Sequence, residues 1–246
     1  MWLLILVVVG IFYLWSPIVF WATHRIPIIP MRRLARDHAP EPVVRAIPEW
    51  EAALAGAGFS LFALHELAVE RISAYRSAGR TAHVLHLVNR STGVHGVDYL
   101  TPNQRWQVFD TRFADGHEVI TSNFGMPETF PDPRVHTLRM PGERDLARLY
   151  ALHLAHVRHV TGAEASGFLP DERGLLDYVA DRERRLLERQ RELGVMTSRN
   201  DVYRPTLRGA FQTVWAYLPP MRWIRGARHA RLVRALKARV EDQTPA

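Results

Sequence analysis

The chain has 246 residues, 47% hydrophobic and 23% charged, which excludes a disordered tail protein and allows one ordinary domain with attachments or two small ones. It contains no cysteine, which excludes disulfides, thiolate nucleophiles, iron–sulfur clusters and cysteine-based zinc sites. The net charge of +7 lies in the flanks: residues 1–46 hold five Arg and two acids, residues 203–246 nine Lys or Arg and two acids, and residues 47–202 18 Arg and 21 acids. A mildly acidic centre argues against nucleic-acid binding, which places a basic stripe on the fold itself.

The first segment, residues 2–23, is uncharged and rich in apolar and aromatic residues. As a helix it would extend over about 33 Å, which matches a bilayer hydrocarbon core of about 30 Å. A cleaved signal peptide is the alternative. It needs a basic n-region and a small-residue cleavage site, and the sequence shows no basic residue before the segment and no convincing cleavage site after it. We therefore predict a transmembrane anchor over residues 1–24, with aromatic anchors at Trp2, Trp15, Phe20 and Trp21.

The orientation of this anchor follows from the charges beside it. Basic side chains come just after the span, in a basic linker over residues 25–46, and none comes before it. The positive-inside rule keeps such a cluster in the cytoplasm. The prediction is a single-pass bacterial protein of the cell inner membrane with its domain in the cytoplasm. The bacterial source is inferred from the near-complete replacement of Lys by Arg, which indicates a GC-rich genome.

The central segment, residues 47–202, predicts one α+β domain. A helix is expected to begin at Pro48 and to close at Gly56 and Gly58. Strands follow from residue 59 to about residue 140. The clearest hairpin joins residues 106–113 to residues 117–121 through an Asp-Gly turn, and a second joins residues 81–88 to residues 94–100. A short run at residues 135–140 completes the strands.

Two helices are expected after the strands. Residues 143–160 carry one apolar stripe at three- and four-residue spacing, and residues 171–193 carry a narrow stripe on an otherwise charged surface. The second helix is most simply a solvated surface, with a protein partner as its alternative role. The predicted fold class is α+β: a transmembrane helix, an antiparallel β-meander flanked by helices, and a C-terminal amphipathic basic helix.

The C-terminal segment, residues 203–246, combines aromatic and basic residues. Residues 209–221 are uncharged but too short to span a bilayer, and cations at three-residue intervals follow. Such a pattern is typical of a helix lying on an anionic lipid surface. The alternative is that residues 209–224 pack on the protein's own core. The predicted membrane-surface residues are Arg222, Trp223, Arg225, Arg228, Arg231 and Arg234.

Twelve histidines are the only unusual supply of functional side chains. His153, His156 and His159 form an HxxHxxH pattern, but the outer two differ by about 120° around a helix and cannot share one ion. A metal site would need a strand histidine as well, so the metal candidates are His117, His136, His153 and His156. For His153, a hydrogen-bonded core histidine is the simpler interpretation. We predict no cofactor.

Other histidine patterns are weaker. His65-Glu66 is followed by Val69 where a zinc-protease motif needs a second histidine. His83 and His86 have opposite parity on a strand, so they point to opposite faces. Asp110 on a strand either lines a pocket or lies in solvent.

The chain also lacks the motifs of α/β-hydrolases, P-loop enzymes and dinucleotide-binding domains. The sequence therefore favours a non-enzymatic binding or scaffold module at a membrane surface. A His- or metal-dependent hydrolase and a lipid-binding domain are the alternatives.

Overall fold

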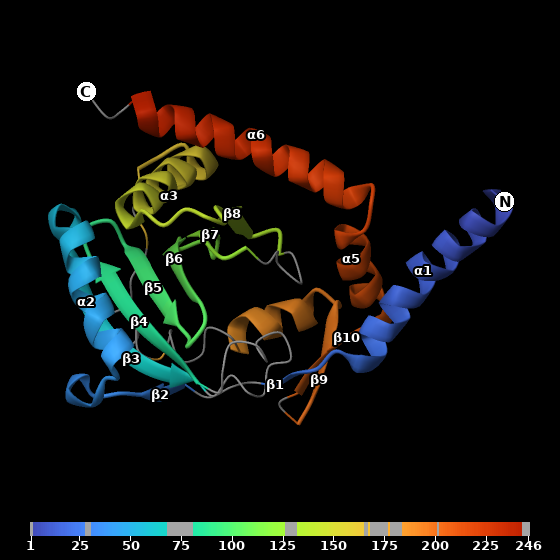
Figure 1. Ribbon diagram of the computed structural model, residues 1–246, viewed down its shortest axis with the longest axis horizontal. Coiled ribbons are helices and arrows are strands. Elements are labelled where there is room, and N and C mark those ends of the chain that lie inside the picture. Colours follow the sequence, from blue (N-terminus) through green and yellow to red (C-terminus); the bar gives the residue numbers. More distant parts are fainter. Residues whose placement is uncertain are drawn as a thin grey trace. The chain divides into compact units, whose positions relative to one another are not determined.

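The computed structural model describes residues 2–27, 31–67, 81–125, 132–164, 167, 177, 184–200 and 202–242, with the side chains of residues 3–9 and 242 excepted. Within these residues the chain is α+β, and it divides into two compact units (Figure 1). The larger unit comprises Ile29–Pro127, Pro133–Ala180 and Leu232–Ala246; the smaller comprises Met1–Ile28, Glu128–Asp132 and Asp181–Arg231.

The larger unit is built on a seven-stranded sheet whose spatial order follows the chain, β2 to β8. Its strands are β2 (Met31–Arg33), β3 (Phe59–Leu67), β4 (Ala82–Asn89), β5 (Val94–Leu100), β6 (Arg105–Arg112), β7 (Glu118–Ser122) and β8 (Val135–Arg139). Both predicted hairpins, β4–β5 and β6–β7, are confirmed. The expected all-antiparallel meander needs one correction, because β8 pairs parallel to β7.

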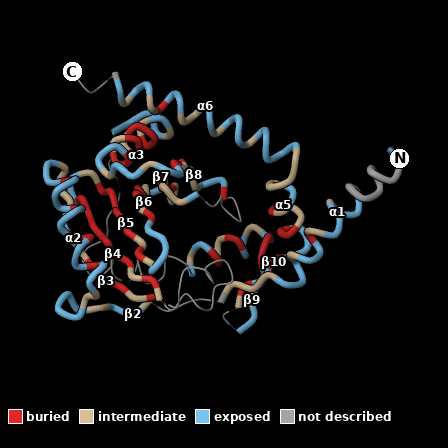
Figure 2. Tube along the Cα trace, in the orientation of Figure 1, coloured by how far each residue is buried: buried red, intermediate tan, exposed pale blue. Residues whose placement is uncertain are grey.

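Helices cover one face of this sheet. α2 (Glu41–Ala53), α3 (Leu146–Thr161) and the second half of α6 (Met221–Asp242) contribute to the core on this face, which we call the helix-covered face. The core is apolar and fully buried at its centre, as Figure 2 shows for β4, β5 and β6; its large members include Trp50, Leu85, Phe109, Leu149 and Leu236. A second apolar cluster with Val84, Val97, Trp106 and Val108 lies on the opposite face.

α2 begins seven residues before the predicted start. Pro40 is its N-cap and a proline occupies the first turn, where the missing N–H is harmless. Pro48 lies inside the helix instead of opening it, because Val43, Ile47 and Trp50 form a buried stripe that outweighs one lost backbone hydrogen bond. The predicted end is close: Gly58 follows a short 3-10 turn, η2 (Ala55–Ala57), with a φ of 78°.

The smaller unit contains a three-stranded antiparallel sheet in the order β1 (Ile26–Pro27), β10 (Val202–Pro205), β9 (Met196–Arg199). α1 (Trp2–Thr23), α5 (Leu207–Tyr217), the first half of α6 and helical residues 184–192 complete it. Leu187, Val195, Met196 and Tyr203 form its small core. Most of the predicted helix over residues 171–193 lies outside the described residues.

α1 makes specific contacts with the segment around α5. Pro17 has no N–H, so the Tyr13 carbonyl four residues earlier lacks its helical donor. Trp215 Nε1 donates to that carbonyl at 3.2 Å, and the Tyr13 hydroxyl donates to the carbonyl of Pro219. The tertiary hydrogen bonds thus compensate for the proline.

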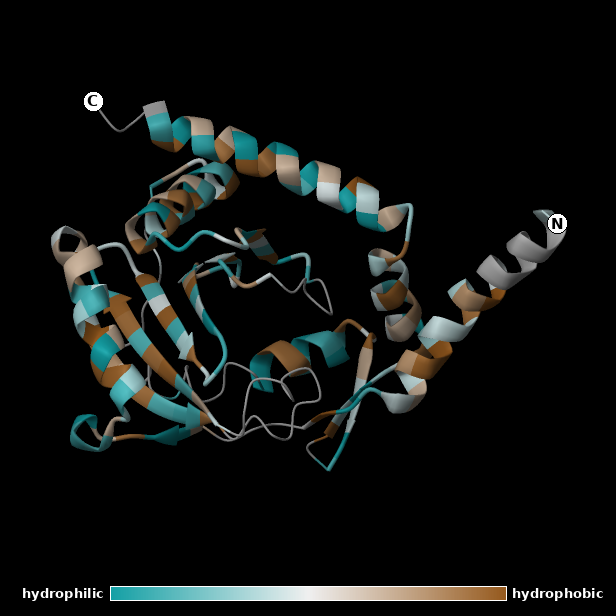
Figure 3. Ribbon diagram, viewed as in Figure 1, coloured by the Kyte–Doolittle hydropathy of each residue, from teal (hydrophilic) through white to brown (hydrophobic). Residues whose placement is uncertain are grey.

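The predicted transmembrane anchor is contradicted. Within the described part of the chain, no helix is both long enough and apolar enough to cross a membrane. Residues 3–9, which open the predicted anchor, have side chains outside the described set. The predicted single-pass inner-membrane localisation and its orientation depended on this anchor, so they are contradicted as well. Figure 3 shows the remaining described helices as mixed in hydropathy.

Candidate functional site

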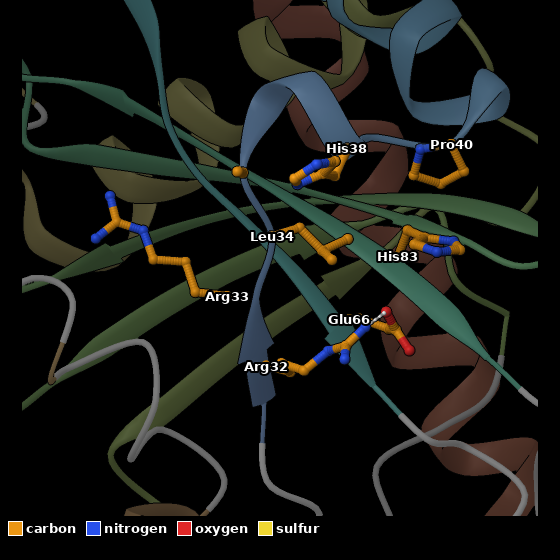
Figure 4. Close-up of a pocket in the computed structure, with 8 residues that line it drawn as sticks. Arg32, Arg33, Leu34, His38, Pro40, Glu66 and His83 are labelled. Atoms are coloured by element: carbon orange, nitrogen blue, oxygen red, sulfur yellow. Dashed lines mark hydrogen bonds and ion pairs between the residues drawn. The ribbon is translucent and has the colours of Figure 1, made fainter.

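A pocket of about 520 Å³ lies at the β2 end of the large sheet (Figure 4). A ligand pocket in a protein is commonly about 300–1,000 Å³, so this volume suits a small molecule. The lining combines charged groups, imidazoles and small apolar groups: Arg32, Arg33, Leu34, Ala35, His38, Pro40, Glu66 and His83.

Local structure brings these groups together. β2 pairs with β3, which sets Arg32 opposite Glu66, and β3 pairs with β4, which sets Glu66 opposite His83. These three residues therefore lie in one row on the helix-covered face. The 3-10 turn η1 (Arg36–His38) and Pro40, the N-cap of α2, close the pocket from the other side.

The polar groups of the pocket are partly satisfied. Arg32 Nη2 donates to Glu66 Oε2 at 2.8 Å, and the Arg32 side chain is 75% exposed, so most of its guanidinium remains available. His83 is half-buried; burial lowers its pKa, and the neighbouring Glu66 carboxylate opposes that shift. Arg33 belongs to the lining, but Figure 4 shows its side chain pointing away from His38, Glu66 and His83.

A second polar cluster lies on the opposite face of the same sheet. It consists of His65 on β3, His86 on β4, His95 on β5 and Asp110 on β6, and we call it the histidine row. Asp110 Oδ2 lies 3.1 Å from His95 Nδ1, and His95 Nε2 lies 3.1 Å from His86 Nδ1. The rings of His86 and His65 meet edge to face with centroids 5.0 Å apart.

All four members of the histidine row are buried, with exposed fractions from 1% to 5%. Their neighbours on this face are apolar, including Val84, Val97 and Val108. Burial lowers the pKa of His65, and the positive charge of Arg33 lowers it further. The arrangement is a line of titratable side chains crossing four strands.

The predicted metal candidates do not form one site. His117 and His136 stack with ring centroids 5.7 Å apart, whereas His153 and His156 lie on α3 and contact Thr121 of β7. Among the residues that the structure describes, no group of three or more His, Asp or Glu side chains is placed to hold a metal ion.

His153 occupies the helix-covered core. Its Nε2 lies 2.9 Å from Thr111 Oγ1 and its Nδ1 lies 3.2 Å from Thr121 Oγ1, so both ring nitrogens have hydroxyl partners. Complete burial lowers the pKa of His153 to about 3, with His156 adding to the effect. Thus His153 is a neutral, hydrogen-bonded core residue.

A buried carboxylate on the same face is also structural. Asp98 accepts from Trp50 Nε1 at 2.7 Å and from the Arg105 guanidinium at 2.7 to 3.2 Å. Burial raises the pKa of Asp98, while the bonds from Arg105 and Trp50 oppose that rise. Arg105 also pairs with Glu49, so this network ties α2 to the sheet.

The predicted membrane-contacting residues are largely at the surface of the smaller unit. Trp2, Trp15 and Trp21 are exposed and Phe20 is half-buried against His24. On α6, Trp223 and the arginines at 222, 228 and 231 are exposed, and Arg225 lies over the Tyr217 ring. Arg234, in the part of α6 that belongs to the larger unit, is exposed too. A lipid role for this α6 surface stays a prediction.

Sequence reasoning missed the histidine row. The parity argument correctly separated His83 from His86, which the structure places on opposite faces. Finding the row required strand register: the β4–β5 pairing makes His86 and His95 diagonal neighbours, and the β5–β6 pairing sets His95 opposite Asp110.

The comparisons with known proteins add nothing to this geometry, because no family model, no curated protein and no solved structure matches the chain.

Proposed function

We propose that the larger unit is a binding module for a small anionic molecule, held in the pocket at the β2 end of the sheet. The observation that supports this proposal is the row of Arg32, Glu66 and His83, which faces His38 across a cavity of about 520 Å³. Ligand pockets characteristically carry a few convergent polar groups of this kind.

The chemistry of the lining favours an anion. Arg32 and two imidazoles stand against one carboxylate, so N–H donors outnumber acidic groups in this part of the lining. A guanidinium binds carboxylate or phosphate through two parallel hydrogen bonds, and Arg32 uses one amino group for Glu66. Glu66 holds Arg32 in position for the ligand.

An acyl chain fits this lining poorly, because charged groups would lose water without gaining partners. The lipid-binding alternative is therefore less well supported than an anionic small molecule. Carboxylates and phosphates share the same recognition chemistry, so both belong in the test.

Isothermal titration calorimetry of the whole chain tests the proposal. The probes are inorganic phosphate, citrate and adenosine monophosphate, with adenosine as the uncharged counterpart. We expect millimolar or tighter binding of at least one anion and no binding of adenosine. Because a hydrogen bond to a charged group contributes about 1.5–3 kcal/mol, Arg32→Ala should weaken binding by roughly 10- to 100-fold.

Arg45→Ala is the matched control. Arg45 forms an exposed ion pair with Glu41 on α2 at 2.6 Å, so this variant removes the same charge and a similar bond outside the pocket lining. It should bind as the parent does. Loss of affinity equal to that of Arg32→Ala, or no binding of any anion, would contradict the proposal.

A further inference from the structure

The charge balance of the pocket depends on its two imidazoles. Arg32 and Glu66 form an ion pair at 2.8 Å, so their formal charges cancel. Arg33 also belongs to the lining, but its side chain points away from the other polar groups (Figure 4). While both imidazoles are neutral, the lining without Arg33 therefore carries no net charge, although its N–H donors suit an anion.

A proton on His83 changes this balance. His83 follows Glu66 in the register of the sheet, and Figure 4 shows the Glu66 side chain between Arg32 and His83. His83 is half-buried, and burial lowers its pKa below 6.5 although the Glu66 carboxylate opposes that shift. In the free pocket at neutral pH, His83 is therefore mostly neutral. An anion within about 4–6 Å favours the charged imidazole, so anion and proton should bind cooperatively.

His38 lines the same cavity from η1 but is a weaker candidate for the proton. Its side chain is 79% exposed, and Asp37 Oδ1 lies 3.8 Å from its Nδ1. Solvent screens a charge on an exposed imidazole, and the Asp37 carboxylate offsets it further. His83, which shares the sheet surface with Arg32 and Glu66, should therefore contribute most of the change.

The other lining groups keep their charge where imidazoles titrate. Arginine and glutamate side chains are ordinarily charged between pH 6 and pH 8, whereas histidine gains its proton near this range. On the other side of β4, the register sets uncharged Leu100 opposite His83. The charged or titratable groups that the structure describes around His83 in the pocket are Arg32, Arg33, Glu66 and His38, with Asp37 beside His38.

We infer that the pocket takes up a proton with its anion, chiefly on His83, so that anion affinity rises as the pH falls from 8 to 6. This inference rests on the proposed function, since it concerns the same pocket and the same ligands. The proton gives the lining a net positive charge, and a protonated imidazole offers two N–H donors in place of one. A ligand that raises the pKa of this imidazole by about one binds about tenfold more tightly to the protonated pocket. The pocket thus fills at mildly acidic pH and releases its ligand as the pH rises.

Isothermal titration calorimetry of the whole chain with sulfate, at pH 6 and pH 8 and constant ionic strength, tests the inference. Sulfate keeps both charges over this range, so a change in affinity reports the protein and not the ligand. Titrations in buffers that differ in ionisation enthalpy give the number of protons taken up with each anion. We expect about tenfold tighter binding at pH 6 and net proton uptake at pH 7. His83→Gln keeps an N–H donor but cannot titrate, so its affinity should change by about twofold or less.

His136→Gln is the matched control. His136 is another partly buried histidine whose pKa is lowered by burial, and it lies on β8, at the opposite edge of the same sheet. This variant should keep the tenfold change. Should His83→Gln fail to fold, proton uptake by the parent still decides.

The inference and the proposed function can fail separately. Sulfate affinity equal at both pH values, no proton uptake, or an undiminished change in His83→Gln would overturn the inference alone. Absence of sulfate binding at pH 6 would overturn it too, and the proposed function fails only when phosphate, citrate and adenosine monophosphate do not bind either.

Discussion

His153 should make the stability of the larger unit fall as the pH is lowered. It is completely buried between two threonine hydroxyls, and burial lowers its pKa from 6.5 to about 3. Because the folded pKa is below the unfolded value, the unfolded chain binds more protons between pH 6.5 and about pH 3. The stabilisation is complete above pH 6.5 and is lost as the pH falls through this window.

The size of the effect follows from these two pKa values. Between pH 7 and pH 5 the unfolded imidazole becomes almost fully protonated, whereas the folded one stays neutral. Linkage then gives a loss of about 2 kcal/mol in the free energy of unfolding over those two pH units.

Urea denaturation at pH 7 and pH 5, followed by circular dichroism, measures this loss. His153→Gln keeps a hydrogen-bonding side chain but cannot titrate, so its loss between the two pH values should be about 2 kcal/mol smaller than that of the parent. His159→Gln, on the exposed side of the same helix, should lose as much as the parent. An equal loss in the parent and in His153→Gln would refute the reasoning.

Three further substitutions test the packing, each by the shift of the urea midpoint. Trp50→Phe removes the 2.7 Å bond to buried Asp98 and should destabilise the larger unit by about 2 kcal/mol or more. Gly209→Ala would place a Cβ 1.9 Å from the Val195 carbonyl oxygen, so it should cost the smaller unit about 1–3 kcal/mol. Asn89→Ala removes a buried side chain that accepts from two backbone N–H groups of the β4–β5 turn, at an expected cost of about 1–3 kcal/mol. For each of the three variants, a urea midpoint equal to that of the parent would contradict the proposed role of the residue.

The hairpins could be predicted because their signals are local. The Asp-Gly turn before β7 supplies a glycine with a φ of 84°, and the turn after β4 ends in Gly93 with a φ of 67°. Alternating strand residues on either side then fix which face each side chain takes. The three- and four-residue spacing of apolar residues is also a local signal. It located α3, whose apolar stripe is the buried face of the helix.

Elements without a local pattern were missed. β1 and β2 are two and three residues long, too short to show a periodicity, and β2 is the strand that builds the pocket. The start of α2 was misplaced because a proline near a helix start and a proline tolerated inside a buried helix look alike in sequence. The predicted anchor depended on hydropathy, segment length and aromatic residues, and the described helices do not support it.

The two candidate sites depend on strand register, which a single sequence does not give. Arg32, Glu66 and His83 are far apart in the chain, and only the pairing of β2 with β3 and of β3 with β4 sets them in one row. The same pairing sets Arg33 opposite His65, whose ring contacts His86 of the histidine row on the other face.

The most direct test of the central claim is a calorimetric titration of the whole chain with the three anions, comparing the parent, Arg32→Ala and Arg45→Ala. The account predicts saturable binding to the parent and to Arg45→Ala, and affinity weakened by about tenfold or more in Arg32→Ala. Absence of anion binding to the parent, or equal binding to all three proteins, would contradict it.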